Sequence, residues 1–298
     1  MNSSVAAVTP ELLRGMPLPQ PDAGGDKEER GRVLVIAGSP MTPGAALLAG
    51  TAALRAGAGK LRIATCRSIA TQLGFAVPEA YVIGLPETAA GGIARAAAAE
   101  LADNVARADA VLIGPGMLER DEVAALTRDI LACSPQPAFL LDAEALVGMR
   151  DSPEAVRQRD RRVLVTPHAG EMASLLRMDR EEVVANPLAA ARKAAALLGA
   201  VVVLKGGCTS VVTPDGEAWT YNQGNVGLAT SGSGDVLAGV AIGLLARGAS
   251  PVEAALWSVY LHGEAGNQLA HQSGPLGFLA RELLAEIPGL MSRVTPAA

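Results

Sequence analysis

The feature that most constrains the fold is a repeated alternation of short apolar segments with helix-like segments. The apolar segments are only a few residues long and almost continuously apolar, which is typical of strands buried on both faces of a parallel sheet. Strands are predicted at 32–37, 61–65, 110–113, 138–141, 162–165 and 201–204. Helices are predicted at 43–57, 92–108, 186–198, 233–246, 251–271 and 276–286. This alternation predicts an α/β fold with an open, doubly wound, mainly parallel sheet and helices on both faces.

The pattern changes after residue 204. Two strand-like segments, Thr209–Thr213 and Ala218–Asn222, flank the turn Pro214-Asp215-Gly216. This arrangement is a hairpin signal, so antiparallel strands are predicted near one edge of the sheet. No internal repeat or composition shift marks a second domain, and 298 residues can form one α/β domain. We therefore expect an N-terminal tail or arm at 1–30 and one catalytic domain at 31–290.

Composition narrows the classes of partner. The net charge is −5, no basic block is present, and aromatic residues make up only 3%, all of which argues against nucleic-acid binding. The longest apolar run, Val236–Ala246, is shorter than the roughly 20 residues of a membrane helix. The first 30 residues lack the basic start and apolar stretch of a signal peptide. A cytoplasmic protein with no membrane partner is the expectation.

The three cysteines, Cys66, Cys133 and Cys208, are odd in number and far apart. No pair of them has the spacing of zinc ligands. Each is expected to be a buried, small apolar residue in a reducing compartment.

Glycine and polar residues gather at the carboxyl ends of the predicted strands. They are Gly38-Ser39, Gly114-Pro115-Gly116, Asp142, His168 and Lys205-Gly206. In open α/β sheets, ligands bind in the crevice at that edge. Glycine and proline can also simply end a strand, but five such ends together favour a binding site.

The most informative stretch is NQGNVGLATSGSGDVLAG, residues 222–239. A glycine-rich loop, residues 224–234, leads into an apolar helix. The start of a helix has unpaired N–H groups and partial positive charge, and glycine lets the backbone approach a ligand closely. Together they predict an anion hole suited to a phosphate. The loop is not a P-loop, because no Gly-Lys-Ser/Thr follows it.

Asp235 stands in the first turn of that helix. It is a candidate catalytic base, because an aspartate beside a phosphate site can accept the proton of an attacking hydroxyl. Helix capping is the alternative, although a loop so rich in glycine is costly to order unless it binds something. The field of the helix is expected to lower the pKa of Asp235 and make it a weak base.

These motifs, in this order, resemble those of the NAD(P)H-hydrate dehydratases, the C-terminal half of YjeF-type repair proteins, within the ribokinase-like superfamily. The resemblance covers about residues 30–285. It rests on Gly38-Ser39 with Pro43-Gly44-Ala45, on Gly114-Pro115-Gly116, on Thr166–Glu171, on Leu204-Lys205-Gly206 with Thr209, and on the loop that ends at Asp235. The TPHxGE pattern and the glycine-rich loop, taken together, are specific to this family.

The resemblance implies a reaction. In that family a nucleotide, ADP in bacterial members and ATP in eukaryotic ones, phosphorylates the ring hydroxyl of hydrated NADH or NADPH. Phosphate then leaves, the normal cofactor returns, and ADP ends as AMP and phosphate. The enzyme is thus a carbon–oxygen lyase. Mg²⁺ is expected, because phosphoryl transfer needs the charge between phosphates neutralised.

The resemblance also implies roles for individual residues. Asp235 is implied as the base, and Gly232, Ser233 and Gly234 as the anion hole. Nucleotide contacts are implied for Lys205, Gly206, Gly207, Cys208, Thr209 and Gly234. Contacts to the hydrated dinucleotide are implied for Ala45, Gly116, His168 and Asp235. Metal ligands stay unassigned, and a homotetramer with a separate epimerase is implied.

Other interpretations of these residues stay open. Lys205 can be a solvated surface lysine, and His168 a structural residue. Glu171 can cap a helix or orient water and metal. Asp142 and Glu144 can support the ligand-binding groups or only begin a helix, and His262 and His271 are expected to be ordinary helix residues.

Two other functions also remain open. One is a small-molecule kinase of the same superfamily, acting on a vitamin precursor or a sugar. The other is a nucleotide-binding module without catalysis. The TPHxGE pattern favours the dehydratases over the first, and Asp235 argues against the second. The chain departs mildly from the family pattern at Val226, Leu228, Ser231 and Ser233, and it has Met41-Thr42-Pro43 where an aromatic residue is common.

Overall fold

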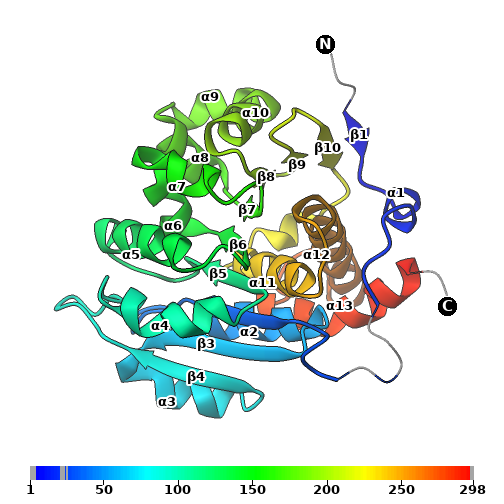
Figure 1. Ribbon diagram of the computed structural model, residues 1–298. Coiled ribbons are helices and arrows are strands. Elements are labelled where there is room, and N and C mark those ends of the chain that lie inside the picture. The colour runs from blue at the N-terminus through cyan, green and yellow to red at the C-terminus, as the bar shows by residue number, and fades with distance from the viewer. Residues whose placement is uncertain (1–4, 21–23, 25, 296–298) are drawn as a thin grey trace.

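Seven short strands run parallel through the centre of the protein, and an antiparallel strand joins them to two more. The computed structural model describes residues 5–20, 24 and 26–295. Its sheet has the order β1-β10-β9-β8-β7-β6-β5-β2-β3-β4 (Figure 1). The strands are β1 (Ala6–Ala7), β2 (Arg32–Ile36), β3 (Lys60–Cys66), β4 (Ala80–Leu85), β5 (Ala110–Ile113), β6 (Ala138–Leu141), β7 (Val163–Val165), β8 (Val201–Leu204), β9 (Thr209–Val212) and β10 (Ala218–Tyr221). The predicted hairpin is confirmed: β9 pairs antiparallel with both β8 and β10.

Helices cover both faces of the sheet (Figure 1). Strand β2 shows why, because Val33 and Val35 enter one core and Leu34 and Ile36 enter the other. The helices of the first core are α2 (Pro43–Arg55), α11 (Ser233–Ala246), α12 (Pro251–Ser273) and α13 (Ala280–Val294). Those of the second are α4 (Ala97–Ala106), α5 (Arg120–Cys133), α6 (Ala143–Val147), α7 (Pro153–Arg157), α8 (Ala169–Leu176), α9 (Arg180–Ala185) and α10 (Pro187–Leu198). The predicted doubly wound α/β architecture is confirmed.

Some predicted boundaries were wrong for local reasons. The helix predicted at 92–108 is α4, which begins only at Ala97, because Ile93 forms an isolated bridge with Glu87. The helix predicted at 276–286 is α13, which begins at Ala280 and follows Gly277, whose φ of 104° is not helical. Helix α3 (Arg67–Ala76), helix α5 and strand β4 were missed. Strand β4 (AYVIGL) is an apolar run that the prediction passed over, and it lies at the sheet edge with Tyr81 67% exposed.

The described part of the predicted N-terminal tail packs against the domain. Strand β1 pairs with β10, and helix α1 (Pro10–Arg14) buries Leu13 completely. The indole Nε1 of Trp257 in α12 donates a hydrogen bond to the Met16 carbonyl oxygen at 2.8 Å. Residues 5–18 are therefore an arm fixed to the body. Residues 1–4, 21–23 and 25 of the predicted segment lie outside the described residues.

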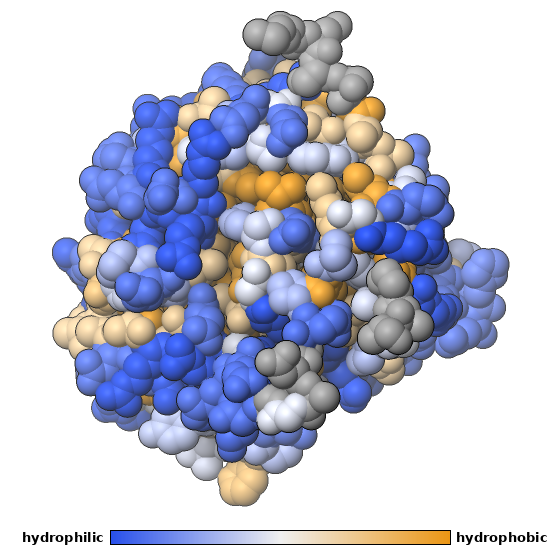
Figure 2. Space-filling view, turned by 45° about the vertical axis from the view of Figure 1, so that its right-hand side comes forward, coloured by the Kyte–Doolittle hydropathy of each residue, from blue (hydrophilic) through white to orange (hydrophobic). Residues whose placement is uncertain are grey.

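The face drawn in Figure 2 is mostly hydrophilic around its rim. Figure 2 shows one face on which apolar side chains gather toward the centre, where the surface is hollowed. Among the described residues, no helix has both the length and the apolar character needed to cross a membrane.

Helix α11 is buried along almost its whole length and packs on α2 through small residues. A Cβ added to Gly239 would lie 2.3 Å from the Ala49 carbonyl oxygen, and one added to Gly243 would lie 2.5 Å from that of Ala53. Backbones can approach this closely only where side chains are missing. The two glycines therefore set the position of α11 against the sheet.

We expect Gly239→Ala to lower the free energy of unfolding by about 1–3 kcal/mol, because a well-packed core must shift to admit the methyl group. Gly289→Ala in α13 is the matched control, since a Cβ there meets only the Arg293 guanidinium at 4.0 Å. The control should gain roughly 0.5–1 kcal/mol from helix propensity. Urea denaturation measures both, and an equal effect in the two variants would contradict this account of α11.

Candidate functional site

The glycine-rich loop ends at the first turn of α11, as the sequence predicts. Gly232 precedes the helix with a φ of 88°, and a Cβ on it would lie 2.5 Å from Leu48 Cδ1. Only glycine fits both the dihedral angle and the space. Ser233 is buried and begins the helix, followed by Gly234 and Asp235. We call Gly232, Ser233 and Gly234 the anion hole, because the N–H groups of a helix start have no partners within the helix. The Ser233 N–H donates to the Thr230 carbonyl oxygen at 3.2 Å, which leaves the N–H groups of the two glycines for a ligand.

A cavity of about 950 Å³ lies over this helix start. Predicted site residues gather in its wall. They are His168, Lys205, Gly206, Gly207, Thr209, Ser233 and Gly234. Its apolar side is formed by Tyr221, Val226, Leu228, Leu237 and Val259. A polar wall beside an apolar one is typical of small-molecule sites.

Lys205 is the electrostatic centre of this wall. Its Nζ lies 3.0 Å from Asp142 Oδ1 and 3.8 Å from Glu171 Oε2, and its side chain is only 19% exposed. Asp142 is also held by Thr166, whose Oγ1 donates to Asp142 Oδ1 at 2.7 Å. The interpretation of Lys205 as a solvated surface lysine is therefore wrong. Asp142 supports the site through Lys205, whereas Glu144 pairs with Arg120 on the surface.

The pKa values of this cluster follow from burial and proximity. Burial alone would lower the pKa of Lys205, but the neighbouring carboxylates of Asp142 and Glu171 raise it. Burial raises the pKa of Glu171, and the charge of Lys205 opposes that rise. Lys205 therefore stays cationic between its acidic neighbours.

The expectation for Asp235 was wrong. Its pKa is raised to about 6, first by burial and then by the negative charge of Asp142, while Lys205 opposes the rise. Loss of water and a like charge thus outweigh the field of the helix start. Such a carboxylate is a stronger base than an ordinary aspartate, which suits proton abstraction.

His168 and Glu171 form a capping box at the start of α8. His168 Nδ1 accepts from the N–H groups of Gly170 and Glu171, and Glu171 Oε2 accepts from the His168 N–H at 2.7 Å. The structural interpretation of both residues is therefore correct. The His168 side chain is still 58% exposed and lines the cavity, so it also remains available to a ligand.

Ala45 and Gly116 meet at a second place on the same sheet edge. A Cβ on Gly116 would lie 2.7 Å from Ala45 Cβ, and Thr42 Oγ1 donates to the Gly116 carbonyl oxygen at 2.7 Å. They follow β2 and β5, where the strand order reverses, which is the usual ligand position in such sheets. Ala45 and Gly116 do not line the 950 Å³ cavity. The pair Ala45 and Gly116 is therefore separate from the cavity wall, and Cys208, Gly232 and Asp235 also lie outside the residues that line the cavity.

Helix α12 supports the loop from behind, which sequence reasoning missed. Glu264 accepts a hydrogen bond from the Tyr221 hydroxyl at 2.6 Å, and the Asn225 amide donates to Asn267 Oδ1 at 3.1 Å. A Cβ on Gly263 would lie 2.2 Å from the Tyr221 ring. Histidine, glycine and asparagine at 262, 263, 266 and 267 share one helix face, and that spacing was the available signal.

His262 departs from the expectation of an ordinary helix residue, because its ring contacts Ser233. The cysteine expectation was partly wrong as well. Cys66 is buried, and burial raises its pKa to about 11, but Cys133 is half-buried and Cys208 is exposed. Among the described residues, no group of three or more His, Cys, Asp or Glu is placed to hold a metal ion.

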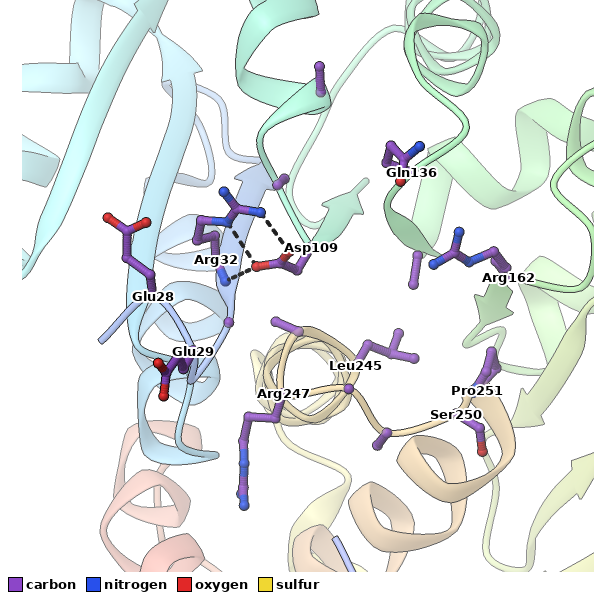
Figure 3. Close-up of a pocket in the computed structure, with 17 residues that line it drawn as sticks. Glu28, Glu29, Arg32, Asp109, Gln136, Arg162, Leu245, Arg247, Ser250 and Pro251 are labelled. Carbon is purple, nitrogen blue, oxygen red and sulfur yellow. Dashed lines mark hydrogen bonds and ion pairs between the residues drawn. The ribbon is translucent and has the colours of Figure 1, made fainter. Parts of the chain in front are cut away.

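A further cavity, of about 710 Å³, lies at the opposite edge of the sheet, where β2, β5 and β6 begin. Figure 3 shows Arg32 and Asp109 turned toward each other there, and they pair at 2.8 Å. Arg247 also lines this cavity, but it donates to the Ala56 and Pro19 carbonyl oxygens. No predicted site residue lies in this cavity.

Comparison of the sequence with known proteins identifies a family. Residues 33–289 match the NAD(P)H-hydrate dehydratase family. A curated ADP-dependent (S)-NAD(P)H-hydrate dehydratase from Xanthomonas campestris is 46% identical over 97% of each chain. The chain belongs to the NAD(P)H-hydrate dehydratase family. It also spans about half the length of the bifunctional NAD(P)H-hydrate repair enzymes that it matches.

Solved structures place this dehydratase-family chain in the same fold. An ADP/ATP-dependent NAD(P)H-hydrate dehydratase from Bacillus subtilis, co-crystallised with ATP and Mg²⁺, is 31% identical with a TM-score of 0.80 over 99% of each chain. A ribokinase-like superfamily protein from Enterococcus faecalis is 27% identical with a TM-score of 0.81, over 98% of this chain and 96% of that one. The predicted ribokinase-like fold is confirmed.

We expect Asp235→Asn to raise the free energy of unfolding at about pH 8 by on the order of 2 kcal/mol. The folded protein holds a proton on Asp235 more tightly than the unfolded chain does, so ionisation above the pKa of about 6 opposes folding. The gain should shrink as the pH falls from about 6 toward the ordinary value of 3.8. Urea denaturation across this range measures it. Asp103→Asn, at an exposed position, is the control. A gain in the free energy of unfolding that does not vary with pH would refute the raised pKa of Asp235.

Proposed function

We propose that this protein restores hydrated nicotinamide cofactors by nucleotide-dependent dehydration of (S)-NAD(P)H-hydrate, with ADP as the donor in preference to ATP. The observation that carries the proposal is the partly buried Asp235, with its raised pKa, at the helix start that forms the anion hole. The 46% identity to a curated ADP-dependent enzyme supports this substrate and this donor.

The arrangement suits phosphorylation followed by elimination. Asp235 accepts the proton of the ring hydroxyl, whose oxygen attacks the terminal phosphorus of ADP, and AMP leaves. The N–H groups of the anion hole hold the transferred phosphoryl group. The carbon–oxygen bond of the phosphorylated ring then breaks and phosphate departs, because phosphate is a far better leaving group than hydroxide. The neighbouring ring carbon loses a proton, which forms the ring double bond and restores the reduced nicotinamide.

The predicted residues divide into a nucleotide set and a dinucleotide set, and His168 of the second set lies in the wall of the cavity that the first set lines. Lys205, Gly206, Gly207, Cys208, Thr209 and Gly234 are assigned to the nucleotide, since most of them line the cavity. Ala45, Gly116 and His168 are assigned with Asp235 to the hydrated dinucleotide. Lys205 carries the positive charge that a nucleotide phosphate needs, and Asp142 and Glu171 keep it charged.

The residues present fit Mg²⁺ that arrives with the nucleotide rather than a resident ion. Asp142 is occupied by Lys205 and Thr166, and the described residues offer no cluster of three or more metal ligands. Mg²⁺ in nucleotide sites commonly keeps several waters and takes one or two carboxylates together with phosphate oxygens. When bound, the ion would neutralise charge between the phosphates.

The remaining parts of the proposal concern organisation. We assign residues 31–290 to one catalytic unit, with the N-terminal arm fixed to it. A homotetramer in the cytoplasm is proposed from the family resemblance. The match to about half of the bifunctional repair enzymes supports a separate epimerase as the partner in repair.

Hydrated NADH mixed with the protein, Mg²⁺ and ADP should regain the near-ultraviolet absorbance of reduced nicotinamide. Asp235→Asn should slow this recovery by about 10²–10⁴-fold, the usual contribution of a general base. Asp103→Asn and a reaction without nucleotide are the controls. Parallel reactions with ATP identify the better donor. If the folded wild type restores no absorbance with either nucleotide, the small-molecule kinase becomes the better hypothesis.

Alkylation provides a test of the nucleotide segment that does not need turnover. Cys208 is exposed, so iodoacetamide should modify it readily, and saturating ADP should slow that modification by about tenfold or more. Cys133, half-buried in α5, is the internal control, and its rate should not change. Peptide mass spectrometry follows both sites. Equal rates at Cys208 with and without ADP would remove residues 205–209 from the nucleotide site.

A further inference from the structure

His262 lies directly behind the anion hole. Its Nε2 is 2.8 Å from Ser233 Oγ and 3.0 Å from the Ser233 carbonyl oxygen. It projects from the middle of α12, whereas Ser233 begins α11. His262 is also part of the cavity wall, so it faces the same space as the proposed nucleotide phosphates. The assignments above do not use this ring.

The two contacts determine which atom carries the proton. A carbonyl oxygen only accepts hydrogen bonds, so its contact with Nε2 requires the hydrogen to be on Nε2. Nε2–H is then shared between the carbonyl and the hydroxyl oxygen of Ser233. The hydroxyl accepts at its oxygen, which leaves its own hydrogen free to be donated elsewhere. Ser233 itself lies between Gly232 and Gly234 of the anion hole.

The surroundings keep the ring neutral and fixed. Burial lowers the pKa of His262 to about 4, and the charge of Lys205 lowers it further, while the Ser233 carbonyl opposes the change. The ring therefore adds no charge beside the phosphate. The next residues of α12 are pressed against the loop, since Gly263 contacts Tyr221 and Gly266 contacts Leu228. The distance between α12 and the anion hole is thus set by close packing.

We propose that His262 is a positioning residue of the anion hole, which holds Ser233 so that its hydroxyl hydrogen is donated to the transferred phosphoryl group. Ser233 then supplies a side-chain donor in addition to the backbone N–H groups. The proposal rests on the proposed function for the identity of the phosphoryl group. It adds a side-chain donor and the residue that aims it. Donors placed in advance where charge develops are among the strongest contributors to catalysis.

Two amide variants separate this role from simple packing. His262→Gln places an amide N–H near the position of Nε2, whereas the amide of His262→Asn is too short to reach it. We expect His262→Asn to lower kcat by about 10–100-fold, the scale of a misplaced or lost donor, with the KM for ADP changed little. His262→Gln should recover most of kcat. Ser233→Ala should lower kcat to a similar degree, which keeps the test usable if His262→Asn folds poorly.

A binding measurement makes the test independent of turnover. Inorganic phosphate should raise the thermal midpoint of the wild type and of His262→Gln, and it should raise that of His262→Asn and Ser233→Ala much less. His271→Asn, at an exposed position of the same helix, is the matched control and should behave like the wild type. If phosphate stabilises the wild type but the wild type does not dehydrate the hydrated cofactor, the proposed function is refuted. The positioning role can then still be tested by the phosphate-induced change of the thermal midpoint. Equal kcat and equal phosphate shifts in the Gln and Asn variants would overturn the positioning role.

Discussion

The burial of α11 is the constraint on which the rest of the structure depends. This helix is apolar nearly all round and lies against α2, with Gly239 and Gly243 touching the α2 backbone. Its first turn carries both the anion hole and Asp235. Because the helix cannot move without opening the core, its unpaired N–H groups are held in one place. Binding an anion there then needs little further ordering of the chain.

The second organising interaction is electrostatic. Lys205 is the cation among Asp142, Glu171 and Asp235, and it stays charged because its neighbours raise its pKa against the effect of burial. The same carboxylates, together with burial, raise the pKa of Asp235. One partly buried cluster thus combines a positive charge with a carboxylate of unusual basicity. Perturbed groups of this kind in a cavity are typical of functional sites.

Helix α12 turns a glycine-rich loop into a defined surface. Tyr221 at the end of β10, and Asn225 and Ser233 in the loop, are each held by a residue of this helix, namely Glu264, Asn267 and His262. Three hydrogen bonds from one rigid element can order a loop that would otherwise be costly to fix. The residues that are held and the α12 residues that hold them are far apart in the sequence. No local pattern therefore predicts these contacts, and they emerge only in the fold.

The sequence by itself determined the α/β alternation, the hairpin, the anion loop and the family, because buried strands and glycine turns leave local patterns. It also predicted that Lys205 and His168 lie close together, since residues at the carboxyl ends of parallel strands meet at one edge, and its glycine-rich loop singled out Asp235. The tertiary structure alone decided the raised pKa of Asp235, the burial of Lys205 and the contact of His262 with Ser233. Those properties depend on charges and packing contributed by other elements, such as Asp142 from the end of β6, and no local pattern contains them.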